Sequence, residues 1–235
     1  SWLLKFVSNI PNHKDHTILT AKMAIESRSE FKRMLSAENI KLDLKEKGIL
    51  HLCDSYKNLE HGRTVSLWLN EAGLIRKEVT LEEISVIEPT IDLSSFIGGF
   101  YTQSDMSGDI HKFTKLLADA CQKKVVKFHY DTAITKVIHN NANPVISFIH
   151  ENNTYKDNFD GLVICAGVHS KKFADDLGDN VNIYPVKGYS ITLLLNDKLS
   201  MKHSPQVSLL DDKAKIVSSR LGADRFRIAG TAEFN

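Results

Sequence analysis

The chain has 235 residues, of which 42% are hydrophobic, and its formal net charge at pH 7 is +1. Such a chain can bury a sizeable core in one large domain or two small ones, which excludes the disordered and fibrous classes. Acidic and basic residues are intermixed, so the charge balance predicts no face for nucleic acid. We expect a small-molecule partner instead.

The cysteines and the apolar runs indicate the cellular compartment of the protein. Cys53, Cys121 and Cys165 are widely spaced and lie in or beside apolar segments, which favours a reducing, cytosolic compartment. Apolar runs such as residues 191–195 are far shorter than the roughly 20 residues of a membrane span, so any membrane contact is expected to be peripheral. The chain begins at Ser1 with neither a methionine nor a signal segment, and we interpret it as the middle of a longer protein.

The first half of the chain alternates predicted helices and strands. Apolar residues recur at helical spacing after Pro11, Gly73 marks a helix end, and Asp109 is expected to cap a helix. The predicted helices span residues 15–37, 60–72, 81–88 and 110–123, and the predicted strands span residues 48–53 and 96–102.

The second half is predicted to be rich in strands. Asn152-Asn153 is expected to turn a hairpin, and residues 221–224 to turn the last one. A long strand that starts at Tyr184 is expected to be antiparallel. The predicted strands span residues 125–130, 133–138, 145–150, 154–159, 159–167, 184–195, 207–210, 214–219 and 225–229.

The stretch from Phe159 to Ser170 carries the most information. An apolar strand runs into Ala166-Gly167 and then into a polar turn. Glycine has no Cβ, so the backbone at such a strand end can approach a bound nucleotide cofactor closely. The alternative interpretation is a buried parallel strand that ends in an ordinary turn.

Three further segments, together with Phe159–Ser170, resemble one enzyme family in the same order along the chain. They are residues 98–109 (GGFYTQSDMSGD), 183–193 (IYPVKGYSITL) and 225–233 (RFRIAGTAE). The chain resembles the flavin-dependent D-amino-acid oxidase superfamily, and within it the small subunits of bacterial D-amino-acid dehydrogenases. Four collinear segments are far more specific than any one of them.

The resemblance implies a mixed α/β (α+β) fold with two domains. Residues 1–105 and 184–235 are expected to form a substrate domain with an antiparallel sheet and helices. Residues 106–183 are expected to belong to the FAD-binding domain.

The implied cofactor is FAD. By resemblance, Ile134 offers backbone hydrogen bonds to adenine, and Ala166, Gly167 and Val168 lie beside the dinucleotide. Ile134 can equally be a core residue of its strand, and both interpretations are compatible. No Gly-x-Gly-x-x-Gly loop occurs, so we expect a fragment without the family's N-terminal dinucleotide motif and C-terminal flavin segment.

The sequence identifies substrate-binding residues less clearly than cofactor-binding residues. The planar guanidinium of arginine can bind the carboxylate of an amino acid through two hydrogen bonds. By resemblance, the arginine that does so in related oxidases lies outside this chain. By resemblance, Lys187, Lys215 and Arg220 are candidates to bind substrate, with a solvated surface charge as the alternative for each. Tyr101 is a candidate wall of the pocket or simply a core residue. No catalytic residue can be assigned.

The sequence does not support a metal site or a hydrolase. His13 and His16 flank Asp15, but a metal site needs three or four convergent ligands, so no metal is expected. His169 and Ser170 are adjacent, yet no Gly-x-Ser-x-Gly elbow exists, which argues against a hydrolase.

The resemblance implies oxidative deamination of small D-amino acids to 2-oxo acids and ammonia. Hydride would pass from Cα to flavin N5, and electrons to a quinone-linked chain at the inner membrane. Two alternatives stay open: an incompetent remnant or a subunit that needs a complementing chain, and an amine oxidoreductase of the glycine or sarcosine oxidase kind. A cut through the flavin domain would leave an unpaired sheet edge, so we also expect self-association.

Overall fold

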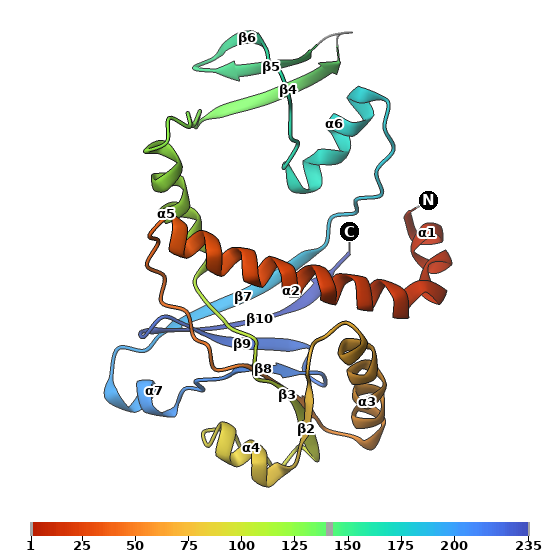
Figure 1. Cartoon of the computed structure of the whole chain (residues 1–235), viewed down its shortest axis with the longest axis vertical. Coiled ribbons are helices and arrows are strands. Elements are labelled where there is room, and N and C mark those ends of the chain that lie inside the picture. Colours follow the sequence, from red (N-terminus) through yellow and green to blue (C-terminus); the bar gives the residue numbers. More distant parts are fainter. Residues whose placement is uncertain (1, 140–142, 235) are drawn as a thin grey trace. The chain divides into compact units, whose positions relative to one another are not determined.

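The computed structural model describes residues 2–139 and 143–234, and Ser1, residues 140–142 and Asn235 lie outside it. The mixed α/β class is confirmed (Figure 1). The chain forms two compact units, and each is described by itself. The smaller unit comprises Ser1–Ser8, Lys124–Val186 and Phe234–Asn235, and the larger unit comprises Asn9–Lys123 and Lys187–Glu233. The assignment of residues 106–183 to a cofactor domain stays a prediction.

The larger unit is built on one seven-stranded sheet with the order β2-β3-β1-β8-β9-β10-β7. Neighbouring strands are antiparallel, as expected, except for the parallel pair β1 and β8. The strands are β1 (Ile49–Cys53), β2 (Lys77–Val79), β3 (Gly98–Thr102), β7 (Lys187–Leu194), β8 (Ser208–Asp211), β9 (Ile216–Leu221) and β10 (Arg225–Glu233).

Strand β1 separates two packed layers because successive side chains of a strand point to opposite faces. Leu50 and Leu52 are buried in a cluster with Ile84 of helix α4 (Leu81–Ile87). On the other face, Cys53 and Phe100 pack against Leu59 of helix α3 (Tyr56–Glu71). Since His51 pairs with Phe100 across the ladder, its side chain shares the α3 face.

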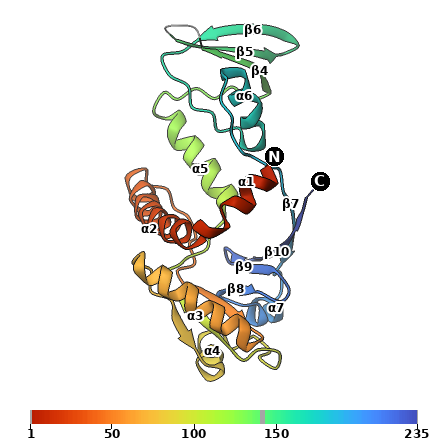
Figure 2. The ribbon, with the colours of Figure 1, turned by 90° about the vertical axis from the view of Figure 1, so that its right-hand side faces the viewer.

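The remaining helices of the larger unit confirm most of the predicted ones. Helix α2 (His13–Ala37) packs on α3 through Ile18 and Ala21, and Asp109 caps α5 (Ile110–Gln122) by accepting from the Lys112 amide. Short elements η1 (Ile10–Asn12) and α7 (Lys198–His203) complete the unit, as the turned view in Figure 2 also shows for α7.

Glu88 ties the end of α4 to the start of β8. Its side chain is 1% exposed. One carboxylate oxygen accepts the backbone N–H groups of Gln206 and Val207 at 2.6 and 3.0 Å, and the other accepts the Thr90 hydroxyl at 2.6 Å. A buried carboxylate is tolerated here because hydrogen bonds replace its lost hydration.

The smaller unit contains the predicted meander of three antiparallel strands, β4 (Thr132–His139), β5 (Pro144–His150) and β6 (Asn153–Asn158). Its turn lies at Glu151-Asn152, one residue earlier than expected, because these two residues take the positive φ values of 48° and 63°. Helix α6 (Ser170–Leu177) packs on β4, and α1 (Trp2–Ser8) and η2 (Gly167–His169) complete the unit.

Two strands predicted in this unit were wrong. Residues 125–130 and 159–167 are not strands, and Val125 and Val163 are 87% and 82% exposed. A strand requires a hydrogen-bonded neighbour, and no strand among the described residues lies beside either segment. The apolar pattern was present in both segments, but the pairing partner was not.

Candidate functional site

The first predicted cofactor residue lies on the meander of the smaller unit. Ile134 pairs with Phe148 in the ladder just before a bulge in β4. Its side chain lines a groove of about 510 Å³ together with Phe148, Ile146 and Phe159, and with Asp157 at its polar edge. This volume falls in the range of small-molecule sites, roughly 300–1,000 Å³. An apolar groove beside free strand edges suits a flat heterocycle.

The second group of predicted cofactor residues forms a tight turn at the entry to α6. Gly167 has a φ of 55°, and nothing lies within 4 Å of the position that a Cβ would take. Ala166 donates its N–H to the Ser170 hydroxyl, and Val168 is 50% exposed. The backbone is therefore open to solvent where the sequence predicts a dinucleotide.

Three predicted substrate residues of the larger unit have evident structural partners. The Tyr101 hydroxyl donates to the Lys47 carbonyl at 2.8 Å. Arg220 is 5% exposed and donates to the Met201 carbonyl at the end of α7 at 2.6 Å. Lys187 is exposed, with its ammonium 4.9 Å from the centre of the Tyr189 ring. Their roles in binding substrate stay predictions, and these three residues do not line a common cavity.

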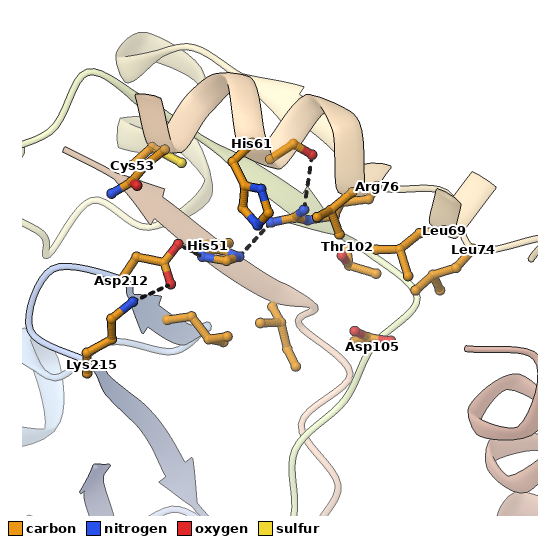
Figure 3. Close-up of a pocket in the computed structure, with 15 residues that line it drawn as sticks. His51, Cys53, His61, Leu69, Leu74, Arg76, Thr102, Asp105, Asp212 and Lys215 are labelled. Atoms are coloured by element: carbon orange, nitrogen blue, oxygen red, sulfur yellow. Dashed lines mark hydrogen bonds and ion pairs between the residues drawn. The ribbon is translucent and has the colours of Figure 1, made fainter. Parts of the chain in front are cut away.

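The fourth predicted residue, Lys215, lines a polar cavity between α3 and the sheet, which we name the α3–β1 pocket (Figure 3). Its volume is about 480 Å³. Polar lining comes from side chains that are far apart in the sequence, namely His51, His61, Arg76, Asp105, Asp212 and Lys215. Apolar lining comes from α3 and the loop that follows it. The pocket lies entirely within the larger unit.

A chain of hydrogen bonds crosses the floor of the α3–β1 pocket. Arg76 donates to His51 Nδ1 at 2.5 Å, and His51 Nε2 lies 2.6 Å from the Asp212 carboxylate. Arginine cannot accept a hydrogen bond, so Nδ1 must be the acceptor and Nε2–H the donor to Asp212. The geometry therefore fixes one neutral tautomer of His51.

Burial and charge set the protonation of this group. Burial lowers the pKa of His51, and the positive charge of Arg76 lowers it further, while the hydrogen bond to Asp212 opposes both effects. Burial also raises the pKa of the neighbouring Cys53 thiol to about 11. Burial thus favours the thiol over the thiolate, which is the nucleophilic form of cysteine.

The hydrogen-bonded residues of this pocket were missed by sequence reasoning. His51 lies on β1, Arg76 precedes β2, and Asp212 follows β8, so no local motif unites them. The one available signal was the strand alternation that places His51 opposite the buried Leu50 and Leu52.

Comparison with known proteins establishes the family. The profile of the FAD dependent oxidoreductase (DAO) family matches residues 6–235. The chain belongs to this family. It is 45% identical over its full length to a protein of Mesorhizobium japonicum named D-amino acid dehydrogenase 3, of which it covers 57%. It is 32% identical to a D-amino acid dehydrogenase of Dechloromonas aromatica, again covering 57% of that protein. The chain thus spans little more than half the length of these curated relatives.

Solved structures share the fold at lower identity. Glycine oxidase from Geobacillus kaustophilus superposes with a TM-score of 0.74 and 16% identity, over 92% of this chain and 55% of that one. L-Proline dehydrogenase from P. horikoshii gives a TM-score of 0.70 and 14% identity, over 92% of this chain and 55% of that one. At such identities the likeness concerns the fold alone.

The cofactor of this family is FAD, and the described residues fit part of it. Open space in front of Gly167 and the apolar groove beside Ile134 could each receive a portion of a dinucleotide. No Gly-x-Gly-x-x-Gly loop for the diphosphate occurs in the sequence.

Neither a metal-binding cluster nor a membrane-spanning helix is present in the part of the chain that the structure describes. Within residues 2–139 and 143–234, no cluster of three or more His, Cys, Asp or Glu side chains is arranged to hold a metal ion. None of the helices described has both the length and the apolar character needed to cross a bilayer.

The pKa of His51 predicts how stability depends on pH. The folded chain holds this pKa below the value of an exposed imidazole, about 6.5, so the neutral ring favours folding above that pH. This contribution is lost as the pH falls through the folded pKa. In His51→Gln, the amide can make both hydrogen bonds without titrating. We expect the loss of unfolding free energy on acidification, measured by urea denaturation, to be smaller in His51→Gln than in the wild type. An unchanged pH dependence would contradict the assignment.

The Gly167 turn predicts a pair of matched variants. Gly167 and Gly178 both have positive φ, at 55° and 85°, and both are surrounded by open space. Alanine at either position costs about 1–2 kcal/mol of backbone strain. Only at Gly167 should the added Cβ obstruct FAD, so we expect Gly167→Ala to weaken FAD affinity about tenfold, or about 1.4 kcal/mol. Fluorescence titration of the chain with FAD measures this. Equal effects of Gly167→Ala and Gly178→Ala would contradict it.

Proposed function

We propose that this chain is the central part of a flavoenzyme that oxidises small D-amino acids. The observation that carries the proposal is 45% identity over the whole chain to a protein named D-amino acid dehydrogenase 3. Identity that extends along all of the chain covers both units, so it includes the residues on the cofactor side and those on the substrate side. Family membership supports the reaction class, and the names of the relatives support the choice of substrate.

The reaction removes two electrons from a carbon–nitrogen bond. The D-amino acid loses its Cα hydrogen with an electron pair and one N–H proton, and water then converts the imino acid to a 2-oxo acid and ammonia. Bound FAD supplies the acceptor for the hydride. On this proposal Ile134, Ala166, Gly167 and Val168 position the adenosine side of the cofactor. Lys187, Lys215, Arg220 and Tyr101 remain candidates on the substrate side.

The reduced cofactor must return its electrons to an acceptor, and we propose a quinone-linked chain. This choice follows the dehydrogenase names of the relatives, because a dehydrogenase passes electrons to an acceptor other than oxygen. A glycine or sarcosine oxidase would use oxygen instead. The fold likeness to glycine oxidase does not favour that alternative, because it rests on 16% identity.

A steady-state assay tests the proposal. The protein that carries this chain, expressed from its own gene, should reduce an artificial quinone analogue with D-alanine in an FAD-dependent reaction. Pyruvate, ammonia and reduced acceptor should form in equal amounts. L-Alanine should give no more than about one hundredth of the rate, because stereospecific hydride transfer requires Cα to be aimed at the flavin.

The other possible results of this assay correspond to the alternative functions. Preference for glycine or sarcosine with hydrogen peroxide formation would replace the dehydrogenase by an oxidase. A protein that binds FAD without oxidising any amino acid would favour a remnant or a subunit that needs a complementing chain. Either result would overturn the proposed function.

A further inference from the structure

Arg76 is a partly buried cation without an acidic partner. Its guanidinium stacks on the Phe100 ring, with 4.4 Å from Cζ to the ring centroid. It donates to the Gly62 carbonyl at 3.4 Å, to the Ser66 hydroxyl at 3.5 Å and to His51 at 2.5 Å. All three acceptors are neutral, and among the described residues no carboxylate forms an ion pair with Arg76. Burial accordingly lowers the pKa of this guanidinium.

The acids that line the α3–β1 pocket are already paired with other cations. Asp212 contacts His51 and lies 3.8 Å from the Lys215 ammonium. Asp105 lies 3.0 Å from the Arg28 guanidinium. Arg76 therefore has no direct counter-ion in this cavity, although the negative charge of Asp212 acts on it from beyond His51. A buried charge is stabilised when a counter-ion reaches it, so the site favours an anion.

The guanidinium of Arg76 has hydrogen-bond donors that remain available. Arginine carries five N–H donors, and the three hydrogen bonds of Arg76 leave at least two N–H groups available. A planar fork of this kind matches a carboxylate in a bidentate arrangement. The anion that fits the chemistry best is therefore a carboxylate.

Aliphatic and polar side chains together line the rest of the α3–β1 pocket. In Figure 3, His61 extends from α3 toward the pair formed by Arg76 and His51, whereas Leu69 and Leu74 lie farther along the cavity, beyond Thr102. Val65 and Leu210 also line the cavity of about 480 Å³, together with the polar side chains of Asp105, Asp212 and Lys215. The aliphatic part of this lining and the N–H groups of Arg76 suit a short hydrocarbon with one charged end.

We propose that the α3–β1 pocket binds a small aliphatic carboxylate, with Arg76 holding the carboxylate and Leu69 and Leu74 contacting the hydrocarbon. All of the residues involved belong to the larger unit. Lys215, a candidate on the substrate side of the proposed function, also lines this pocket, so the two proposals share one residue. Neither the groove beside Ile134 nor the Gly167 turn contributes to the pocket, so binding of isovalerate without FAD tests it apart from the oxidation.

Calorimetric titration of the 235-residue chain with isovalerate tests the site. Isovalerate carries a carboxylate on a branched chain, and isovaleramide is its uncharged counterpart. We expect saturable binding of isovalerate with a dissociation constant of about 1 mM or below, and at least about tenfold weaker binding of isovaleramide. Absence of binding at about 10 mM isovalerate, or equal binding of the two compounds, overturns the proposal.

Two arginine variants locate the binding. Arg76→Met keeps an unbranched side chain of similar length against Phe100 and removes the charge, so isovalerate affinity should fall about tenfold or more. Arg63→Met is the matched control. Arg63 lies on α3 and pairs with Glu60 and Glu78 outside the pocket, so its loss should leave affinity within about twofold. Full affinity in a folded Arg76→Met variant overturns the proposal.

A spectroscopic readout covers the case in which Arg76→Met does not fold. In the wild type, isovalerate should shift the NMR signals of the His51 ring, because the carboxylate competes for the guanidinium that donates to Nδ1. Arg76→Lys should retain weaker binding, because an ammonium supplies charge without the planar fork. Unshifted His51 signals at saturating isovalerate contradict the site.

Discussion

The alternation of side chains along β1 is the constraint on which the larger unit depends. Leu50 and Leu52 must face α4 to complete the main core, and a strand has a side-chain period of two. His51 is consequently held on the α3 face, within reach of Arg76 and Asp212. A register shift of one residue would bury the imidazole and expose two leucines. The same packing that stabilises the sheet therefore fixes the floor of the α3–β1 pocket.

Local signals predicted the elements whose partners lie within the chain. The hydrophobic spacing of α2, the cap at Asp109 and the compact segment of β1 all led to correct elements, because each depends on nearby residues or on a core that this chain supplies. Residues 125–130 and 159–167 also contain apolar runs but need neighbouring strands. Strand formation is a property of pairs, so the pattern of one segment could not decide it.

The site residues divide in the same way, into those marked by a local segment and those that only the assembled sheet brings together. Gly167 could be singled out because a glycine without a Cβ directly follows an apolar run, a pattern contained in one short segment. The pocket residues His51, Arg76 and Asp212 come from three distant segments, and only the ladder of β3, β1 and β8 brings them together. Arg220 was named by resemblance as a candidate to bind substrate, and this role stays a prediction. In the structure its guanidinium donates to the carbonyls of Met201 and Ser204.

We propose that this member of the FAD dependent oxidoreductase family holds the adenosine side of its cofactor with the smaller unit. Hydrogen–deuterium exchange of the chain, measured with and without saturating FAD, tests it most directly. Bound cofactor should slow exchange at the amides of β4 around Ile134 and of the turn from Ala166 to Ser170, because these backbone groups would lose access to water. Unchanged exchange in both segments, or protection confined to the larger unit, would contradict the claim.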